Sequence, residues 1–155
     1  IEGDKELLRA RVIRRLRQVM NLGKRYDVKV LIENVGLRTK NNVLFDLPEY
    51  VALFDIFPQA GALLDTGHAH VNGWDIPAVV KALGERLAAC HVHDNDGNGD
   101  AHLPVGQGDI DWKAYFGAVK KYAPQATQVF EYCCGFNNTK DLEAHIAELK
   151  ANYKL

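Results

Sequence analysis

Hydrophobic and polar positions follow two different periods along the chain, and these periods predict its helices and strands. Near the N-terminus, Leu8, Val12, Leu16 and Val19 recur at helical spacing. Residues 28–32 instead form a short apolar run rich in β-branched side chains, which is typical of a buried strand. The two patterns alternate to the end of the chain. They predict helices over about 4–26, 47–57, 76–83, 112–122 and 141–153, and strands over 28–32, 60–64, 87–92 and 127–130.

Strands that alternate with helices and are almost continuously apolar indicate an α/β fold with a parallel sheet covered by helices. A Gly- and Asp-rich stretch over 95–108 interrupts the alternation and is expected to be a long loop. Four strands fit either an open sheet or half of an eight-stranded barrel, and the pattern alone leaves both open. With 155 residues and no dividing linker, we expect a single domain over 1–155.

Composition and charge exclude several classes of function. The chain is 47% hydrophobic and 25% charged, and its net charge of −1 is unlike that of a basic nucleic-acid-coating module. No apolar run approaches the roughly 20 residues of a membrane span. Cys90, Cys133 and Cys134 are too few and too unevenly spaced for a disulfide framework. We therefore expect a cytoplasmic protein with neither a nucleic-acid nor a membrane partner.

Each predicted strand ends in a side chain that can bind a metal. These residues are Glu33, Asp65, His91 and Glu131, and they are separated by 32, 26 and 40 residues. Because the carboxyl ends of parallel strands share one edge, the four side chains are expected to converge. Three carboxylates and one imidazole suit one divalent ion: Mn²⁺, Mg²⁺, Co²⁺ or Zn²⁺. Any one of them, taken alone, is more often a helix N-cap or a salt-bridge partner.

Further candidates flank the ends of the strands. His68 follows Asp65, and His93 shares a face with His91 if the strand stays extended, so both are candidate ligands or hydrogen-bond partners of ligands. Asp94, Asp100 and His102 lie in the long loop, where a solvated turn cluster is the competing interpretation of the aspartates.

Four stretches together resemble a known superfamily. They are 32–34 (IEN), 64–68 (LDTGH), 91–97 (HVHDNDG) and 102–112 (HLPVGQGDIDW). In this order they resemble the xylose-isomerase-like sugar-phosphate isomerase/epimerase superfamily, which is related to endonuclease IV and has a TIM-barrel fold. The resemblance covers nearly the whole chain but only the second half of that barrel, strands five to eight.

The resemblance implies roles for individual residues. Glu33, Asp65, His91 and Glu131 match the family's metal ligands, and His68 and Asp94 match its substrate-contacting positions. Asp100 and His102 match the spacing of an Asp-x-His pair that binds additional zinc in endonuclease IV, and His102 is also a candidate substrate contact. Two departures count against specific activities. The residues after Glu33 differ from the glycine-rich sequence of endonuclease IV, and Gly97 lies near the position where a ketose 3-epimerase carries arginine.

A complete barrel of this type needs about 250 residues. The chain begins at Ile1 and its only methionine is Met20, so we expect a fragment or a truncated reading frame that self-associates or pairs with a missing N-terminal half.

The predicted function is a divalent-metal-dependent isomerase or epimerase of a small sugar, sugar phosphate or polyhydroxy carbonyl compound. Proton transfer would pass through a metal-stabilised enediolate, with Glu33 and Glu131 as base and acid. Two alternatives stay open: a zinc-dependent abasic-site endonuclease, and a catalytically inert half-barrel remnant.

Overall fold

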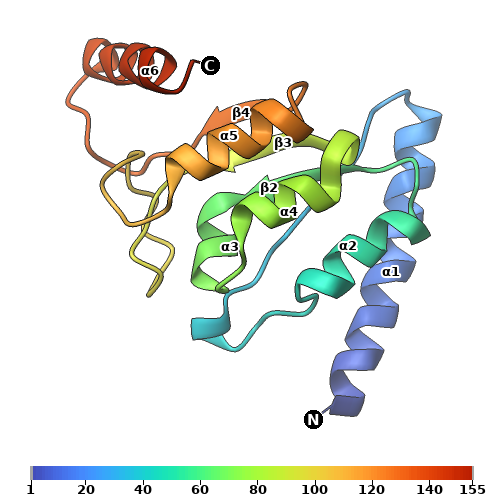
Figure 1. The fold of residues 1–155 in the computed structure, drawn as a ribbon. Helices are drawn as coiled ribbons and strands as arrows, with labels where there is room; N and C mark the ends of the chain where they lie inside the picture. The colour runs from blue at the N-terminus through green and yellow to red at the C-terminus, as the bar shows by residue number, and fades with distance from the viewer. Residues whose placement is uncertain (1, 155) are drawn as a thin grey trace.

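Four parallel strands in the order β1-β2-β3-β4 form the centre of the fold (Figure 1). The structure, a computed structural model, describes residues 2–154. Each strand pairs in parallel with the next one along the chain, as the alternation of strands and helices predicts. The strands are β1 (Leu31–Glu33), β2 (Gly61–Asp65), β3 (Leu87–Val92) and β4 (Thr127–Phe130).

Helices connect the strands and cover one face of the sheet, where α4 and α5 lie side by side (Figure 1). The helices are α1 (Glu2–Arg25), α2 (Leu47–Ile56), α3 (Thr66–Val71), α4 (Ile76–Leu83), α5 (Trp112–Tyr122) and α6 (Thr139–Tyr153), with two short 3-10 turns, η1 (Arg38–Lys40) and η2 (Gly84–Arg86). None of the helices within residues 2–154 is both long enough and apolar enough to cross a bilayer.

Capping residues explain where these helices begin. Asp46 and Glu49 form a reciprocal capping box at the start of α2, and Asp75 and Asp111 each accept a hydrogen bond from a backbone N–H in the first turn of α4 and α5. Proline occupies the first turn of α2 and α4, where a missing N–H leaves no hydrogen bond unmade. These local signals are why the bounds of α4 and α5 match the predicted ranges.

The hydrophobic core lies between the helices and one face of the sheet. Its strand residues include Ile32, Ala62, Leu64, Cys90 and Val92, and its helix residues include Tyr50, Phe54, Val80, Tyr115 and Phe116. The Tyr50 hydroxyl contacts the carbonyl oxygens of Ile32 and Leu63, at 3.0 and 2.8 Å. This contact ties α2 to both β1 and β2 and so fixes the edge from which Glu33 projects.

The opposite face of the sheet is open within residues 2–154. Val129 of β4 is aligned with His91 of β3, and its side chain is 41% exposed. The outer strands β1 and β4 have no second strand neighbour in the described part of the chain. The fold is therefore an α/β sheet of four parallel strands with two unpaired edges.

Several bounds differ from the sequence prediction by one or two residues, and the larger differences concern β1 and α3. β1 begins at Leu31 rather than at residue 28, and α6 begins two residues earlier than expected. Helix α3 was not predicted at all, because its six residues are too few to show a helical period. Its N-cap is Asp65, whose carboxylate accepts a hydrogen bond from the His68 backbone N–H at 2.7 Å.

A candidate metal centre at the carboxyl edge of the sheet

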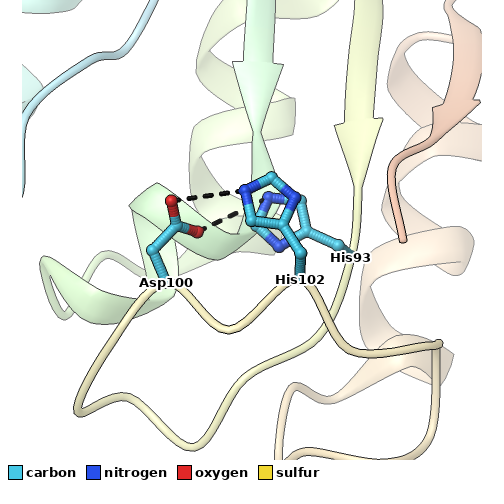
Figure 2. A group of neighbouring side chains, drawn as sticks. All are labelled: His93, Asp100 and His102. Carbon is cyan, nitrogen blue, oxygen red and sulfur yellow. Dashed lines mark ion pairs between the residues drawn. The ribbon is translucent and has the colours of Figure 1, made fainter. Parts of the chain in front are cut away.

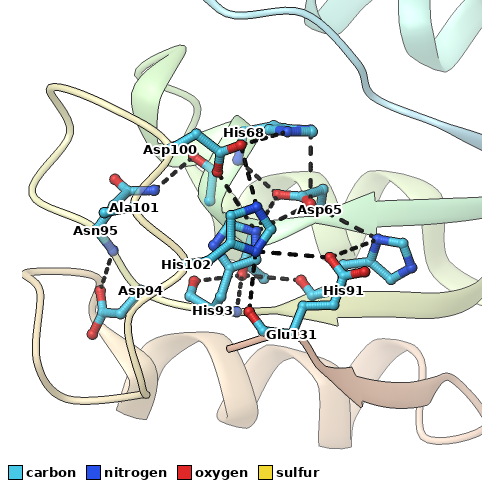
Figure 3. A network of polar contacts seen from close by, with 12 residues as sticks. Asp65, His68, His91, His93, Asp94, Asn95, Asp100, Ala101, His102 and Glu131 are labelled. Atoms are coloured by element: carbon cyan, nitrogen blue, oxygen red, sulfur yellow. Dashed lines mark hydrogen bonds and ion pairs between the residues drawn. The ribbon is translucent and has the colours of Figure 1, made fainter. Parts of the chain in front are cut away.

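The three carboxylates at the strand ends lie around the imidazole of His91. Figure 3 shows His91 with two of them, Asp65 and Glu131. His91 Nδ1 lies 3.6 Å from Glu33 Oε1, 3.9 Å from Asp65 Oδ2 and 3.4 Å from Glu131 Oε2. Ligand atoms of Glu33, Asp65 and His91 all lie within 4.8 Å of one another. The parallel register thus brings together side chains that are far apart in the sequence.

Asp65 is the most buried of the four, with 1% of its side chain exposed. Asp65 caps α3, and its two carboxylate oxygens also lie 3.1 and 3.2 Å from His93 Nε2. The side chain of Asn34 forms two hydrogen bonds with the backbone of Asp65. Asn34 Nδ2 donates to the Asp65 carbonyl oxygen, and Asn34 Oδ1 accepts from the Asp65 N–H. Asp65 therefore has one fixed orientation, toward the histidines.

A second group is formed by His93, Asp100 and His102 (Figure 2). It adjoins the first group, because His93 Nε2 contacts Asp65. Asp100 Oδ2 is 3.3 Å from His102 Nε2, and Oδ1 is 3.8 Å from His93 Nε2. The two imidazoles stack, with centroids 3.9 Å apart and planes inclined by 13°. Both His93 Nδ1 and Asp100 Oδ1 are buried without a hydrogen-bond partner among the described residues.

His68 bridges the two groups. Its Nδ1 lies 3.0 Å from the Asn34 carbonyl oxygen and 3.7 Å from Glu33 Oε1, and its Nε2 lies 3.3 Å from Asp100 Oδ2. The ring is only 16% exposed. Because the Asn34 carbonyl can only accept, a hydrogen bond to it requires a proton on Nδ1.

The structure does not bring Asp94 to this cluster. Its carboxylate is fully buried and accepts hydrogen bonds from within the long loop and the start of α5: from the backbone N–H of Asn95, Gly106 and Ile110, and from Trp112 Nε1 at 2.7 Å. The backbone of Asp94 also pairs with that of Leu103. Asp94 thus organises the loop that carries Asp100 and His102.

Two backbone features allow this close packing. A Cβ at Gly67 would overlap the His93 ring, so only glycine lets α3 approach the imidazole this closely. His102 has a φ of +48°, a left-handed conformation that non-glycine residues adopt at an energetic cost. Hydrogen bonds hold it there, because His102 Nδ1 lies 3.1 Å from the Glu131 carbonyl oxygen and the Cys133 N–H donates to the His102 carbonyl.

Charge crowding perturbs two of the carboxyl groups. Burial and then the nearby Asp65 charge raise the pKa of Glu33, and His91 and His68 oppose the rise. Burial acts to raise the pKa of Asp65 as well, but the hydrogen bond and charge of His93 outweigh it, so that pKa lies below its usual value. The cluster therefore combines one carboxyl group that holds its proton more readily and one that stays ionised.

The structure brings together all of the candidate site residues except Asp94, and it adds Asn34 to them. His93 contacts Asp65 and Asp100, and its position two residues after His91 was the available signal, although its direction was open. Asn34 follows Glu33 in the sequence, but nothing in the sequence indicates that its amide spans β1 and β2.

The donors also fit a divalent cation on chemical grounds. The groups that could hold an ion combine the carboxylates of Glu33, Asp65, Asp100 and Glu131 with the imidazoles of His91, His93 and His102. Carboxylate and imidazole are the ligands that Mn²⁺, Co²⁺ and Zn²⁺ share. The two partnerless buried atoms, His93 Nδ1 and Asp100 Oδ1, are polar groups that a bound ion or water would satisfy.

Comparison with known proteins finds similarity in sequence and in fold. Two uncharacterized proteins of Methanocaldococcus jannaschii are 29% identical over 113 residues and 30% over 104, and one of Sinorhizobium fredii is 32% identical over 95. These alignments cover 60–71% of this chain. The chain spans only 30–42% of the length of these relatives.

Two solved structures share the fold. A D-tagatose 3-epimerase-like protein superimposes with a TM-score of 0.71 at 23% identity, and a D-allulose 3-epimerase from Methylomonas sp. with a TM-score of 0.76 at 18% identity. They cover 91% and 94% of this chain, which in turn spans 52% and 55% of theirs. A profile of one family matches residues 2–151. The chain belongs to the xylose isomerase-like TIM barrel family.

Proposed function

We propose that this protein is a divalent-metal-dependent isomerase or epimerase of a small sugar, sugar phosphate or polyhydroxy carbonyl compound. The observation that carries the proposal is the meeting of Glu33, Asp65 and Glu131 around His91 at the carboxyl edge of the sheet. Two structures with the same fold are described as D-tagatose 3-epimerase-like and D-allulose 3-epimerase, which supports the same class of chemistry.

Glu33, Asp65, His91 and Glu131 are the residues that would hold the cation. Their donor set admits Mn²⁺, Mg²⁺, Co²⁺ or Zn²⁺. When bound, such an ion supplies Lewis-acid polarisation of the substrate carbonyl. Hydrogen bonds around Asp65, from His93 and Asn34, would keep this ligand in one orientation and so support the affinity of the site.

Glu33 and Glu131 are the proposed proton carriers. Isomerisation and epimerisation both begin with removal of a proton from a carbon beside a carbonyl and end with its return to carbon. Glu33 and Glu131 approach His91 from the two outer strands, β1 and β4, so they flank the site. His68 is proposed to hydrogen-bond a substrate oxygen.

The test is the Glu131→Gln variant, with Glu143→Gln on the exposed surface of α6 as the matched control. Turnover is measured as deuterium uptake from heavy water beside the carbonyl of a panel of ketoses and aldoses, with Mn²⁺ supplied. We expect Glu131→Gln to lose at least about 100-fold in turnover, the scale of a general acid or base. Mn²⁺ binding, followed by calorimetry, is expected only to weaken. Retention of most of the turnover would refute the role of Glu131.

The group formed by His93, Asp100 and His102 favours a second candidate, a zinc-dependent abasic-site endonuclease. Metal stoichiometry separates the two: three tightly bound zinc ions favour the nuclease, and one divalent ion favours the isomerase. A chain that binds no Mn²⁺ or Zn²⁺ at neutral pH would instead be an inert remnant of the fold.

A further inference from the structure

Two adjacent cysteines lie outside the candidate metal centre, in the turn between β4 and α6. Cys133 and Cys134 are both exposed, and their Sγ atoms are 3.4 Å apart. The Cys133 backbone N–H donates to the His102 carbonyl at 3.0 Å, and its thiol donates to the Ala101 carbonyl at 3.2 Å. The turn is therefore anchored to the long loop, and the two thiols are held on the same side of it.

A cavity of about 520 Å³ adjoins the two thiols. Its walls are mainly apolar, from Phe130, Tyr132, Phe136, Leu142 and Ile146. Tyr132 and Phe136 stand with ring centroids 5.6 Å apart at an inclination of 35°. The cavity is larger than one aromatic ring, and its aromatic walls can contact an apolar substituent held at the thiols. The dithiol and the apolar pocket thus occur side by side.

The separation of the sulfur atoms is short enough for a single atom to bridge them with a narrow bond angle. With bonds of about 2.3 Å, as for thiolate on zinc, two sulfurs 3.4 Å apart subtend about 95° at a shared atom. A tetrahedral ion requires them about 3.8 Å apart by the same geometry, and a linear two-coordinate ion requires about 4.6 Å. Trivalent arsenic and antimony, which form pyramidal bonds near a right angle, fit without rearrangement.

We propose that Cys133 and Cys134 form a capture site for trivalent arsenicals, and that the adjoining pocket receives an aryl substituent on the arsenic. Phenylarsine oxide is the probe. Each thiol sulfur forms one bond to arsenic, both S–H bonds break, and the two protons leave with the oxide oxygen as water. Arsenic stays trivalent and both sulfurs keep their oxidation state, so the step needs no oxidant or reductant. The site is independent of the proposed isomerase chemistry.

The test is retention of phenylarsine oxide by the reduced chain, followed by intact mass. The wild-type chain is expected to retain one phenylarsenic group in excess glutathione and to release it to ethane-1,2-dithiol, because only a dithiol competes with two sulfurs. Cys133→Ser and Cys134→Ser are each expected to lose the label in glutathione. Cys90→Ala, the matched control at the buried cysteine, is expected to keep it.

Retention by either single serine variant, or no retention by the wild-type chain, would overturn the proposal. Among the described residues, the Cys134 side chain forms a hydrogen bond only with Cys133, and it is exposed, so Cys134→Ser is expected to fold normally. Phe136→Ala tests the pocket separately. This variant is expected to weaken the binding of phenylarsine oxide by up to about tenfold, because one contact between aromatic rings is lost. The binding of inorganic arsenite, which has no ring, is expected to stay unchanged. If Phe136→Ala weakened the binding of both arsenicals equally, the pocket would not be the site of the aryl group.

Discussion

His93 Nε2 lies within 3.2 Å of both carboxylate oxygens of Asp65, and both side chains are almost completely buried. The pair fixes the orientation of Asp65, which also caps α3. A buried carboxylate that loses its partner keeps its desolvation penalty without compensation, and this makes the pair sensitive to substitution.

Replacing His93 tests that dependence. His93→Ala is expected to lower the free energy of unfolding by about 3–5 kcal/mol, because it leaves the Asp65 carboxylate buried without its imidazole. Urea denaturation in the presence of a chelator measures the loss without any contribution from a metal. The control is His70→Ala, which breaks only the partly exposed pair with Asp109 and is expected to change stability by at most about 1 kcal/mol. Equal losses in the two variants would contradict this account.

Asp94 is predicted to act through the loop it organises. Asp94→Ala removes the acceptor of four hydrogen bonds, including the one from Trp112 Nε1, and is expected to cost about 3 kcal/mol or more. Trp112 fluorescence is expected to shift to longer wavelength, because the loosened loop lets water reach the indole that is buried in the wild-type chain. Asp96→Ala, at an exposed position of the same loop, is the control and is expected to stay within about 0.5 kcal/mol. An unshifted emission spectrum in Asp94→Ala would contradict the proposed role of Asp94 in organising the loop.

Cys90 makes stability depend on alkaline pH. Burial in the core raises the pKa of its thiol from 9.0 to about 11. The unfolded chain therefore loses this proton at a lower pH than the folded chain does. The stabilising contribution is complete below pH 9 and is lost as pH rises toward 11.

We expect the free energy of unfolding to fall by about 2 kcal/mol between these limits through this group alone. Urea titrations at pH 8 and pH 10.5 measure the fall, and Cys90→Ala is expected to show a smaller one. A remaining dependence belongs to Tyr50 and Tyr115, whose pKa values burial also raises. Identical pH dependence in the two chains would exclude Cys90 as a source.

The open face and unpaired edges of the sheet predict self-association. β4 of one copy can pair in parallel with β1 of another, which would cover both edges and the half-exposed Val129. Sedimentation velocity over a concentration series is expected to show species larger than a monomer. Val129→Lys, which places a charge on the open face, is expected to shift the distribution toward the monomer. A monodisperse monomer of the wild-type chain at the highest concentration would refute the prediction.

The sequence by itself determined the order of elements and the identity of the residues at the strand ends. The apolar runs and the capping residues determine helices and strands through interactions between sequence neighbours, so their pattern predicts these elements directly. Glu33, Asp65, His91 and Glu131 could be named together because parallel strands align their carboxyl ends, and family motifs pointed to the same four.

Only the tertiary structure decided the directions of the side chains in the turns and the long loop. Asp94 and Asp100 belong to the same Gly-rich stretch, yet Asp94 turns inward to Trp112 while Asp100 turns toward His102. The hydrophobic pattern does not predict helix α3 either, because six residues are too few to show a helical period. The physical reason is that such segments have no repeating pattern, and their conformation depends on hydrogen-bond partners that lie many residues away in the sequence.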